Sequence, residues 1–473
     1  MISRGVILTV VSQVVMLISG FGINLALARL LGPEDYGTFG LVISILIIVE
    51  MFVFTGIPEA IRKFGGETPE LMRSIKKKTL PWQVVYCLAM YIVLFFFTPI
   101  ISSVLSDDRL TTLLRIAGLN VFFFGLHKYF DAIQCGLHNF FKYSLLGIIY
   151  SISRLVAIVG IVLAGFSLIG ALIGNFSASV IGLLFGIIFL KYLKQQKNKK
   201  EINTKKYVNF IIPNIIYFVG LNLFFSIDLW FVKYFLSDLN VGYYVSAAAL
   251  SKLPYFLSMG LSAVLLPSIS HSIATSDFVR TREIISDSLR YVLIFLILIV
   301  VVVFFNGRQI IEFVMGAEYS EAGPVLGVLM AGLSLATIMI VNQTILISKN
   351  LMKLCFYQVL FLLIIDIILN AYLVPRYQMF GAAFSTSIVG LLGMIITSAY
   401  IFEDIKELLV PYTGKLVLAI IITGLFSFGF NFFALHIIFK LIFLSSIYFI
   451  VLYALKIINT VDIERLKMAV QIS

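Results

Sequence analysis

Apolar runs of about twenty residues follow one another along almost the whole chain of 473 residues. Each run is long enough for a helix to cross a hydrocarbon core about 30 Å thick. The runs are not the alternating ten-residue segments that are typical of outer-membrane barrels. Because a helix satisfies its own backbone hydrogen bonds in lipid, the pattern predicts an all-α integral membrane protein.

Short polar segments divide the apolar runs, and a window of about twenty residues separates them into spans. The predicted spans are 5–29, 36–61, 80–105, 111–135, 144–164, 168–191, 208–234, 243–270, 288–305, 323–347, 354–374, 379–402, 414–433 and 436–456. We therefore expect about fourteen transmembrane helices. The first span is longer than the apolar region of a signal peptide, which has about 7–15 residues, so we expect it to be retained.

Positive charge is concentrated on one side of the predicted membrane. If the N-terminus is cytoplasmic, 25 of the 35 Lys and Arg residues lie in segments that face the cytoplasm, including the linker 191–206. Because cytoplasmic segments carry an excess of Lys and Arg, we expect a multi-pass protein of the cell membrane with both termini cytoplasmic. Topology and attraction to anionic membrane lipids also explain the net charge of +11, and we expect no nucleic acid partner.

The composition, 60% hydrophobic and 12% charged, leaves little room for a soluble catalytic domain. The sequence has no Gly-rich phosphate loop ending in Gly-Lys-Ser/Thr, no zinc motif and no nucleophile elbow. Cys87, Cys135 and Cys355 are far apart and lie in or near apolar runs, which favours neither disulfides nor a metal site. We therefore expect a protein that is not an enzyme, without catalytic residues, metal or cofactor.

Two parts of the chain resemble each other at an offset of 211 residues. The segment GLHNFFKYSL (136–145) aligns with ISKNLMKLCF (347–356), which matches one Asn and one Lys in each. The segment GALIGNFSASVIG (170–182) aligns at the same offset with GAAFSTSIVGLLG (381–393). The chain therefore contains an internal repeat.

The repeat predicts the domain organisation. Residues 1–191 and 207–402 would each form a lobe of six helices in the same orientation, and 414–456 would add two further helices. Duplicated halves of this kind are characteristic of transporters in which one bundle rocks against the other.

A resemblance to a known family rests on three segments: LARLLGPEDYGTFGLV after the first helix, its weaker counterpart FVKYFLSDLNVGYYVSAAAL (231–250), and LLPSISH (265–271). On these residues the chain resembles the polysaccharide transport branch of the multidrug/oligosaccharidyl-lipid/polysaccharide (MOP) exporter superfamily, which includes O-antigen flippases. The resemblance implies two pseudo-symmetric six-helix lobes around a cavity lined by the first, second, seventh and eighth helices. It further implies transfer of a polyprenyl-pyrophosphate-linked oligosaccharide to the outer leaflet, with a glycan polymerase or other assembly proteins as candidate partners.

Polar residues on those four helices are candidates for substrate binding. An ionisable group inside a helix costs about 2.5–3.5 kcal/mol on insertion scales unless it meets water or a partner, and cationic side chains hold phosphates. Gln13 and Asn24 lie on a small, polar side of the first helix, which close helix packing would also explain. The substrate-binding candidates are Lys252, Arg29, Glu50, Gln13, Asn24, Asn222 and Asp228.

Some of these residues have simpler interpretations. Arg29 could reach the outer headgroups, and Lys252 could pair with Asp228 inside the bundle. Glu50, near the middle of the second helix, could line the cavity or take part in ion coupling. At the inner end of that helix, Glu59 and Arg62 are spaced for an i,i+3 ion pair.

A second group of residues could couple transport to an ion gradient. His127 and Asp131 lie four residues apart on the fourth helix, a stripe that could relay protons or form a structural network. Asp366 on the eleventh helix occupies nearly the same place in its repeat as Arg154 does. The ion-coupling candidates are Asp131, His127 and Asp366.

Other functions remain open from the sequence. A multidrug/cation antiporter of the same superfamily is similar in size, but the thirteenth and fourteenth helices and the Gly-Pro-Glu-Asp-Tyr-Gly turn favour the polysaccharide branch. A lipid II-type flippase is a further alternative. A membrane-embedded glycosyltransferase or polymerase would need a large outward loop, and the longest one expected here is about 306–322.

Overall fold

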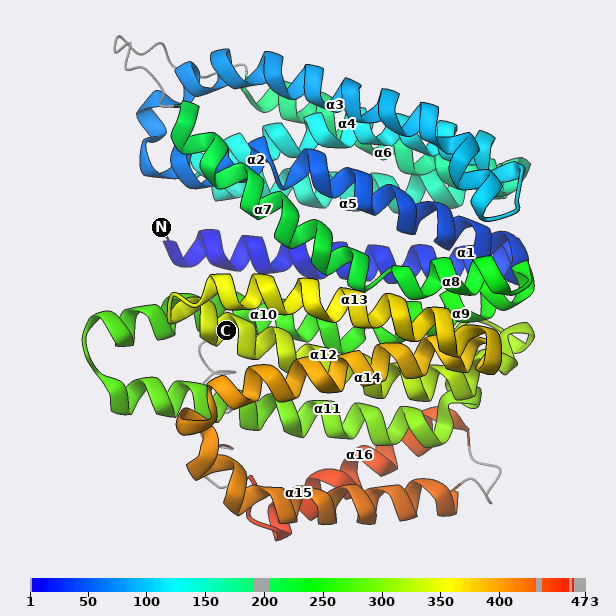
Figure 1. Cartoon of the computed structure of the whole chain (residues 1–473), viewed down its shortest axis with the longest axis vertical. Helices are drawn as coiled ribbons and strands as arrows, with labels where there is room; N and C mark the ends of the chain where they lie inside the picture. The colour runs from blue at the N-terminus through cyan, green and yellow to red at the C-terminus, as the bar shows by residue number, and fades with distance from the viewer. Residues whose placement is uncertain (1, 191–203, 431–435, 459–461, 463–473) are drawn as a thin grey trace. The chain divides into compact units, whose positions relative to one another are not determined.

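The computed structural model describes residues 2–190, 204–430, 436–458 and 462, and every regular element in these residues is helical. The helices are α1 (Ile2–Phe54), α2 (Ile57–Ala60), α3 (Met72–Val104), α4 (Arg109–Gly136), α5 (Phe140–Ile161), α6 (Ser167–Leu190), α7 (Thr204–Phe224), α8 (Ile227–Phe235), α9 (Asp238–Ser251), α10 (Leu253–Ala274), α11 (Phe278–Val314), α12 (Gly323–Ser348), α13 (Met352–Tyr377), α14 (Met379–Tyr400), α15 (Phe402–Phe430) and α16 (Ile437–Ala454). Figure 1 shows their course. The predicted all-α class is confirmed.

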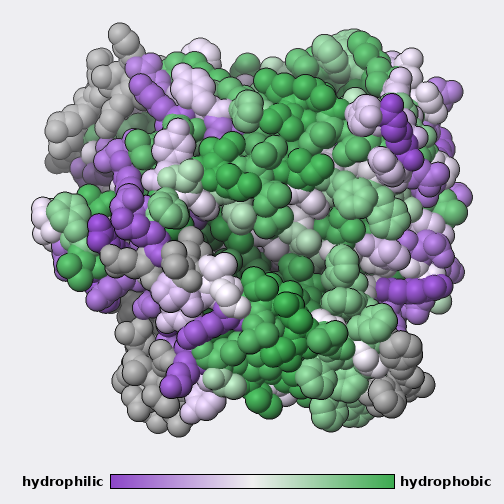
Figure 2. All heavy atoms as spheres, turned by 60° about the horizontal axis from the view of Figure 1, so that its bottom comes forward, coloured by the Kyte–Doolittle hydropathy of each residue, from purple (hydrophilic) through white to green (hydrophobic). Residues whose placement is uncertain are grey.

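Twelve helical stretches of the described residues are long and apolar enough to cross a membrane. Two of these, Leu8–Phe54 and Phe140–Leu190, contain left-handed residues, Gly32 (φ 74°) and Ser167 (φ 42°), at which one helix ends and the next begins. Each of the two stretches therefore holds two spans, in keeping with the expected number. On the face that Figure 2 shows, hydrophobic residues fill the middle and hydrophilic residues lie toward the left and right sides.

Two predicted spans are shorter than the helices that contain them. Helix α3 begins at Met72 rather than near residue 80, and α11 covers 278–314 rather than 288–305. At the start of α11, the Asp277 side chain accepts a hydrogen bond of 2.9 Å from the backbone N–H of Arg280 and caps the helix. Hydropathy registers only lipid-compatible residues, so it misses helical turns that continue into the polar region.

The expected outward loop at 306–322 was also wrong. Helix α11 continues to Val314 after a kink at Asn306, and a 3-10 helix, η4 (Ala317–Ala322), follows. Asn306 donates a hydrogen bond of 2.9 Å to Ser427 on α15, which holds the kinked turn. The polar residues in this stretch therefore mark a kink and a pairing site within helices.

The chain forms two compact units, Met1–Val245 and Ser246–Ser473. In the first unit α1 packs against α5, and α4 packs against α3 and α6. In the second unit α12 packs against α11 and α14, and the Tyr448 hydroxyl of α16 donates to the Ile294 carbonyl of α11 at 2.8 Å. Helices α7 and α8 belong to the first unit, so the division into compact units does not coincide with the predicted sequence repeat.

Backbone conformation agrees with the internal repeat. Ser167, the first residue of α6, and Gln378, just before α14, are both left-handed (φ 42° and 53°) and are 211 residues apart. Asn139 and Asn350 lie in the turns that precede α5 and α13. The left-handed residues Ser167 and Gln378 thus occupy matching positions, and the extent of the two lobes stays a prediction.

The orientation in the membrane is a testable prediction. Most of the linker, 191–203, lies outside the described residues, and we expect it to be cytoplasmic because of its Lys-rich composition. A Cys at Lys199, in a chain without its three native cysteines, should resist a membrane-impermeant thiol reagent added to intact cells. A Cys at Glu34, in the exposed turn of α1, should react. Labelling at 199 from outside would contradict the orientation.

Candidate functional site

The turn inside α1 explains part of the Gly-Pro-Glu-Asp-Tyr-Gly motif. The chain reverses at Gly32, and Pro33 begins the returning helix (Figure 1). Tyr36 is fully buried, and its hydroxyl donates a hydrogen bond of 2.9 Å to Asn24 on the first half of the hairpin. Asn24 therefore joins the two halves of the hairpin, which is a structural role for this substrate-binding candidate.

Gly37 of the Gly-Pro-Glu-Asp-Tyr-Gly motif lies against Gly242 of its weaker counterpart. A Cβ on Gly242 would lie 2.0 Å from the Pro33 carbonyl oxygen, and one on Gly37 would lie 2.5 Å from the Gly242 nitrogen. Only the absence of a side chain permits so close a backbone approach. The backbone at the start of α9 is therefore in direct contact with the backbone of the α1 hairpin.

Asp228 and Asn222 lie on either side of the break between α7 and α8. The buried Asp228 carboxylate accepts hydrogen bonds from the Tyr244 hydroxyl and, at 2.7 Å, from the Leu229 backbone N–H. The half-buried Asn222 amide donates to the Phe218 carbonyl at 2.9 Å. The Asp228 carboxylate is thus hydrogen-bonded inside the first unit. The Asn222 side chain lies on a partly exposed face, where its amide oxygen can accept a hydrogen bond.

The remaining candidates on the first helix are exposed. Gln13 lies on the exposed face of α1, and Arg29 is exposed one turn before the reversal at Gly32. Both side chains can therefore meet water or a polar ligand on the surface of the first unit.

Lys252 occupies a break in the eighth predicted span. Helix α9 ends at Ser251, Lys252 is the N-cap residue of α10, and Pro254 lies in the first turn of α10. A helix start carries a partial positive charge, so the half-buried Lys252 ammonium adds to an existing positive end. Lys252 belongs to the second unit and the other substrate-binding candidates to the first.

Glu50 points into the first unit. Its side chain is buried, and its carboxylate accepts a hydrogen bond of 2.6 Å from Asn120 on α4. Close by in the same bundle, the Arg154 guanidinium donates to Asn175 at 2.7 Å and joins α5 to α6. Glu50 is therefore held inside the first unit, and both roles that the sequence left open for it stay predictions.

A charged network lies at the end of the same bundle that the sequence predicts to be cytoplasmic. The predicted ion pair of Glu59 and Arg62 is present at 2.8 Å, and Arg62 also binds Asp131 at 3.1 Å. The Lys128 ammonium lies 3.7 Å from the same Asp131 carboxylate. Burial would lower the pKa of Arg62, but the carboxylates of Glu59 and Asp131 raise it, so the guanidinium stays charged. A five-residue π-helix, η1 (Ile61–Gly65), carries Arg62.

His127 lies one turn deeper than Asp131. Its ring is fully buried and stacks on Tyr150, with a centroid distance of 4.9 Å and an interplanar angle of 19°. Gly182 leaves room for the ring, because a Cβ there would lie 2.6 Å from Nδ1. His127 is therefore tightly held beside the charged network.

Asp366 forms a polar centre in the second unit. Its carboxylate accepts hydrogen bonds from the Asn370 amide at 2.9 Å and from the Ser385 hydroxyl at 2.7 Å, and all three side chains are buried. One carboxylate with neutral oxygen donors suits a proton or a monovalent cation better than a divalent metal. Among the described residues no group of three His, Cys, Asp or Glu could hold a metal ion.

Sequence reasoning missed the partners that complete these centres. Asn120, Asn175 and Ser385 are small polar residues in apolar helices. Residues of this kind also occur where helices only pack closely, so the sequence does not identify them as hydrogen-bonding partners. Pairing across helices, as between Arg62 and Asp131, depends on which faces meet and has no signal in a single sequence.

Solved structures with the same fold are membrane transporters. The chain is similar to the lipid II flippase MurJ in its inward closed conformation, with a TM-score of 0.73 and 19% identity over 94% of this chain and 99% of that one. It is also similar to an inward-facing multidrug resistance MATE family transporter of the MOP superfamily, with a TM-score of 0.68 and 13% identity over 82% and 95% of the two chains.

Sequence comparison gives the family. An uncharacterised membrane protein of Methanocaldococcus jannaschii is 27% identical over 392 residues, which cover 78% of this chain and 90% of that protein. The family described as polysaccharide biosynthesis protein matches residues 2–273, more than half of the chain. Because this match covers more than half of the chain, the chain belongs to the polysaccharide biosynthesis protein family, and it shares its fold with solved membrane transporters.

Proposed function

We propose that this protein is a flippase that moves a polyprenyl-pyrophosphate-linked oligosaccharide from the cytoplasmic to the outer leaflet by alternating access. The match of residues 2–273 to the polysaccharide biosynthesis family carries the proposal. The likeness in fold to a lipid II flippase supports it, because that protein's name states a lipid-linked substrate.

The substrate's chemistry assigns roles to the candidate residues. Pyrophosphate needs cationic donors, which Lys252 at the start of α10 and the exposed Arg29 can supply. The sugars need neutral hydrogen-bonding groups, for which Gln13 and Asn222 are suited. The prenyl chain can stay in the bilayer throughout, so the protein has to shield only the polar part.

The proposal is tested by reconstituting the purified protein in vesicles with a fluorescent polyprenyl-pyrophosphate oligosaccharide. Movement of the label between leaflets should exceed that in protein-free vesicles, and a polyprenyl phosphate without sugar should move less. Equal movement in both kinds of vesicle would contradict the proposal. Export of a cationic drug instead, with no effect on the lipid-linked sugar, would favour the antiporter, a function with structural relatives of the same fold.

We further propose that Asp366 is a coupling site for a proton or a monovalent cation. Its carboxylate is buried between α13 and α14 with the Asn370 amide and the Ser385 hydroxyl. A buried charge of this kind is costly unless it binds a cation or a proton. Glu50, Asp131 and His127 form a second candidate path in the first unit.

Asp366→Asn should therefore uncouple transport from an ion gradient. The amide retains the shape and much of the hydrogen bonding of the carboxyl but removes its charge. We expect that an imposed Na⁺ or H⁺ gradient, which accelerates movement by the unmodified protein, has no effect on this variant. Ser385→Ala removes one hydrogen bond and leaves the charge, so it should keep the response. An unchanged gradient response in Asp366→Asn would exclude the site.

A further inference from the structure

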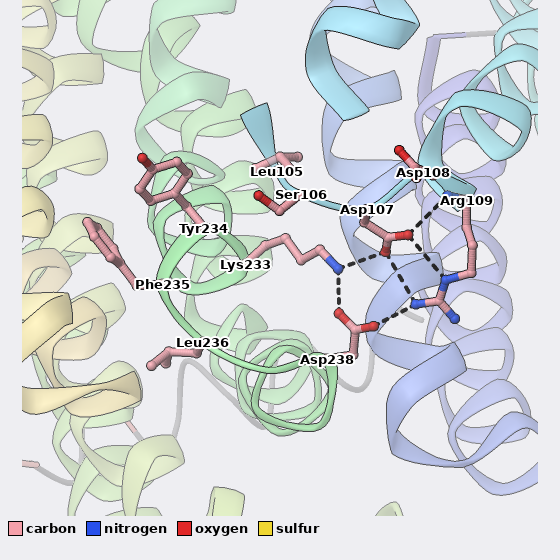
Figure 3. A pocket seen from close by; sticks show the side chains of 10 residues that line it. All are labelled: Leu105, Ser106, Asp107, Asp108, Arg109, Lys233, Tyr234, Phe235, Leu236 and Asp238. Carbon is pink, nitrogen blue, oxygen red and sulfur yellow. Dashed lines mark hydrogen bonds and ion pairs between the residues drawn. The ribbon is translucent and has the colours of Figure 1, made fainter. Parts of the chain in front are cut away.

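Four charged side chains form a closed ring in the first unit. The ring contains Asp107 between α3 and α4, Arg109 at the start of α4, Lys233 on α8 and Asp238 at the start of α9 (Figure 3). Lys233 binds Asp107 at 2.8 Å and also Asp238, while Arg109 binds Asp107 at 3.2 Å and Asp238 at 2.5 Å. The predicted topology places this group, the outer ring, on the external side.

Water and ions can reach the outer ring. It lies in an open cavity of about 430 Å³, whose wall also includes Ser106 and Tyr234. Arg109 has 55% of its side chain exposed, whereas Lys233 has 6%. The ring therefore has a solvated side and a buried side, and its charged groups can be hydrated wherever they separate.

The outer ring joins the two halves of the sequence repeat. Asp107 and Arg109 come from the first half, and Lys233 and Asp238 come from the second. The contact of Gly37 with Gly242 joins the same two halves nearby. This external seam thus contains ion pairs and a close contact of glycine backbone, next to the Val245 side chain, which packs on Gly40.

Such a seam is suited to opening and closing. Apolar side chains that interlock lose their burial when they separate, whereas separated ion pairs regain hydration. A buried ion pair contributes little net stability compared with apolar residues of similar volume. The inner contacts between the same halves are different, since Phe64 packs against Tyr207 and Phe210 there.

We propose that the outer ring is the external latch of the transporter, which holds the outer side closed and separates each time the protein opens outward. The inference rests on the proposed alternating access. It assigns Lys233 as the central residue, because this side chain binds both carboxylates from the buried side.

The latch should not respond to pH in the physiological range. Burial alone would raise the pKa of Asp107, but hydrogen bonds from Arg109 and Lys233 outweigh it and hold that pKa below its usual value. Asp238 shares both cations and faces the same centre. The stabilisation of the closed ring by the Asp107 carboxylate is thus complete above the unfolded pKa of about 3.9. It is lost only as pH falls through the lower pKa of the folded state. The latch should therefore be equally closed at about pH 5.5 and 7.5.

Accessibility of Ser44 tests the latch without any substrate. Ser44 is buried in the seam, where it accepts a hydrogen bond of 2.9 Å from Trp230 on α8. In a chain without its native cysteines, Ser44→Cys should react slowly with an impermeant maleimide from outside. Lys233→Met should raise that rate about tenfold or more, because it leaves the Asp107 and Asp238 carboxylates without their shared buried cation in the closed state.

The matched control is Arg308→Met, which removes the exposed ion pair with Glu312 on α11. It should leave the labelling rate unchanged. An unchanged rate in folded Lys233→Met, or an equal rise in the control, would overturn the latch.

A reversible cross-link covers the case in which Lys233→Met does not fold. Ser106 and Tyr234 are both exposed and line the ring's cavity, so Cys residues there leave the ring intact. Bridging them with a short, reducible bifunctional thiol reagent should stop movement of the lipid-linked sugar, and reduction should restore it. Movement at the unbridged rate would overturn the latch. No movement before bridging would instead count against the proposed function, while the labelling test still decides the latch.

Discussion

Lys252→Ala, expressed at the normal level, is expected to leave the lipid-linked oligosaccharide in the inner leaflet. Lys252 stands at the break between α9 and α10, where the start of α10 adds positive potential to its ammonium. Loss of a charge-assisted contact with pyrophosphate removes about 1.5–3 kcal/mol, or roughly a ten- to hundredfold loss in substrate affinity. The measurement is the rate of label movement in vesicles together with surface glycan production in cells.

Three further variants make the result specific. Lys252→Arg should be partly active, because the charge remains but its geometry changes. Lys353→Ala removes an exposed positive charge from the first turn of α13 and should have little effect. Full glycan production by Lys252→Ala combined with Arg29→Ala would rule out recognition of pyrophosphate by these cations, and both residues would then be anchors.

Gly242→Ala is expected to destabilise the protein strongly. The new methyl group would lie 2.0 Å from the Pro33 carbonyl oxygen, and neither backbone segment can move aside without separating α9 from the α1 hairpin. Overpacking of this kind typically costs about 1–3 kcal/mol and occasionally more. We expect a lower thermal midpoint and less monodisperse protein in detergent.

Gly260→Ala is the control for Gly242→Ala. Gly260 lies within α10, and a Cβ placed there would have no other helix and no described side chain within 4 Å. Ala favours a helix over Gly by about 1 kcal/mol, so this variant should be at least as stable as the parent. Equal midpoints for the two variants would show that the close approach at Gly242 does not contribute to stability.

Much of the fold follows from local sequence. The all-α class and the helix count depend on apolar run length, which is set by the thickness of the bilayer and the need to pair every backbone group. The reversal at Gly32 was foreseeable because Gly and Pro end a helix. The repeat was detectable because turn residues such as Asn139 and Asn350 are polar in a largely apolar chain.

Helix ends and charged extensions were less predictable. The first turns of α11 are stabilised by the Asp277 cap and by the ion pair of Arg280 with Glu283 at 3.0 Å, whereas α3 begins at Met72 without a side-chain cap. Hydropathy assigns these polar turns to loops, since it measures transfer into lipid and not hydrogen bonding.

The sequence by itself determined that this protein is a helical membrane protein with a small set of costly charges inside its helices, and it predicted duplicated halves. Which charges meet was decided only by the tertiary structure. Glu50 could have faced a cavity, but it lies against Asn120, and Lys233 reaches Asp107 across 126 residues of sequence. The physical reason is range: burial preference acts on each residue separately, whereas an ion pair requires two side chains within about 4 Å, and only packing of the helices brings them there.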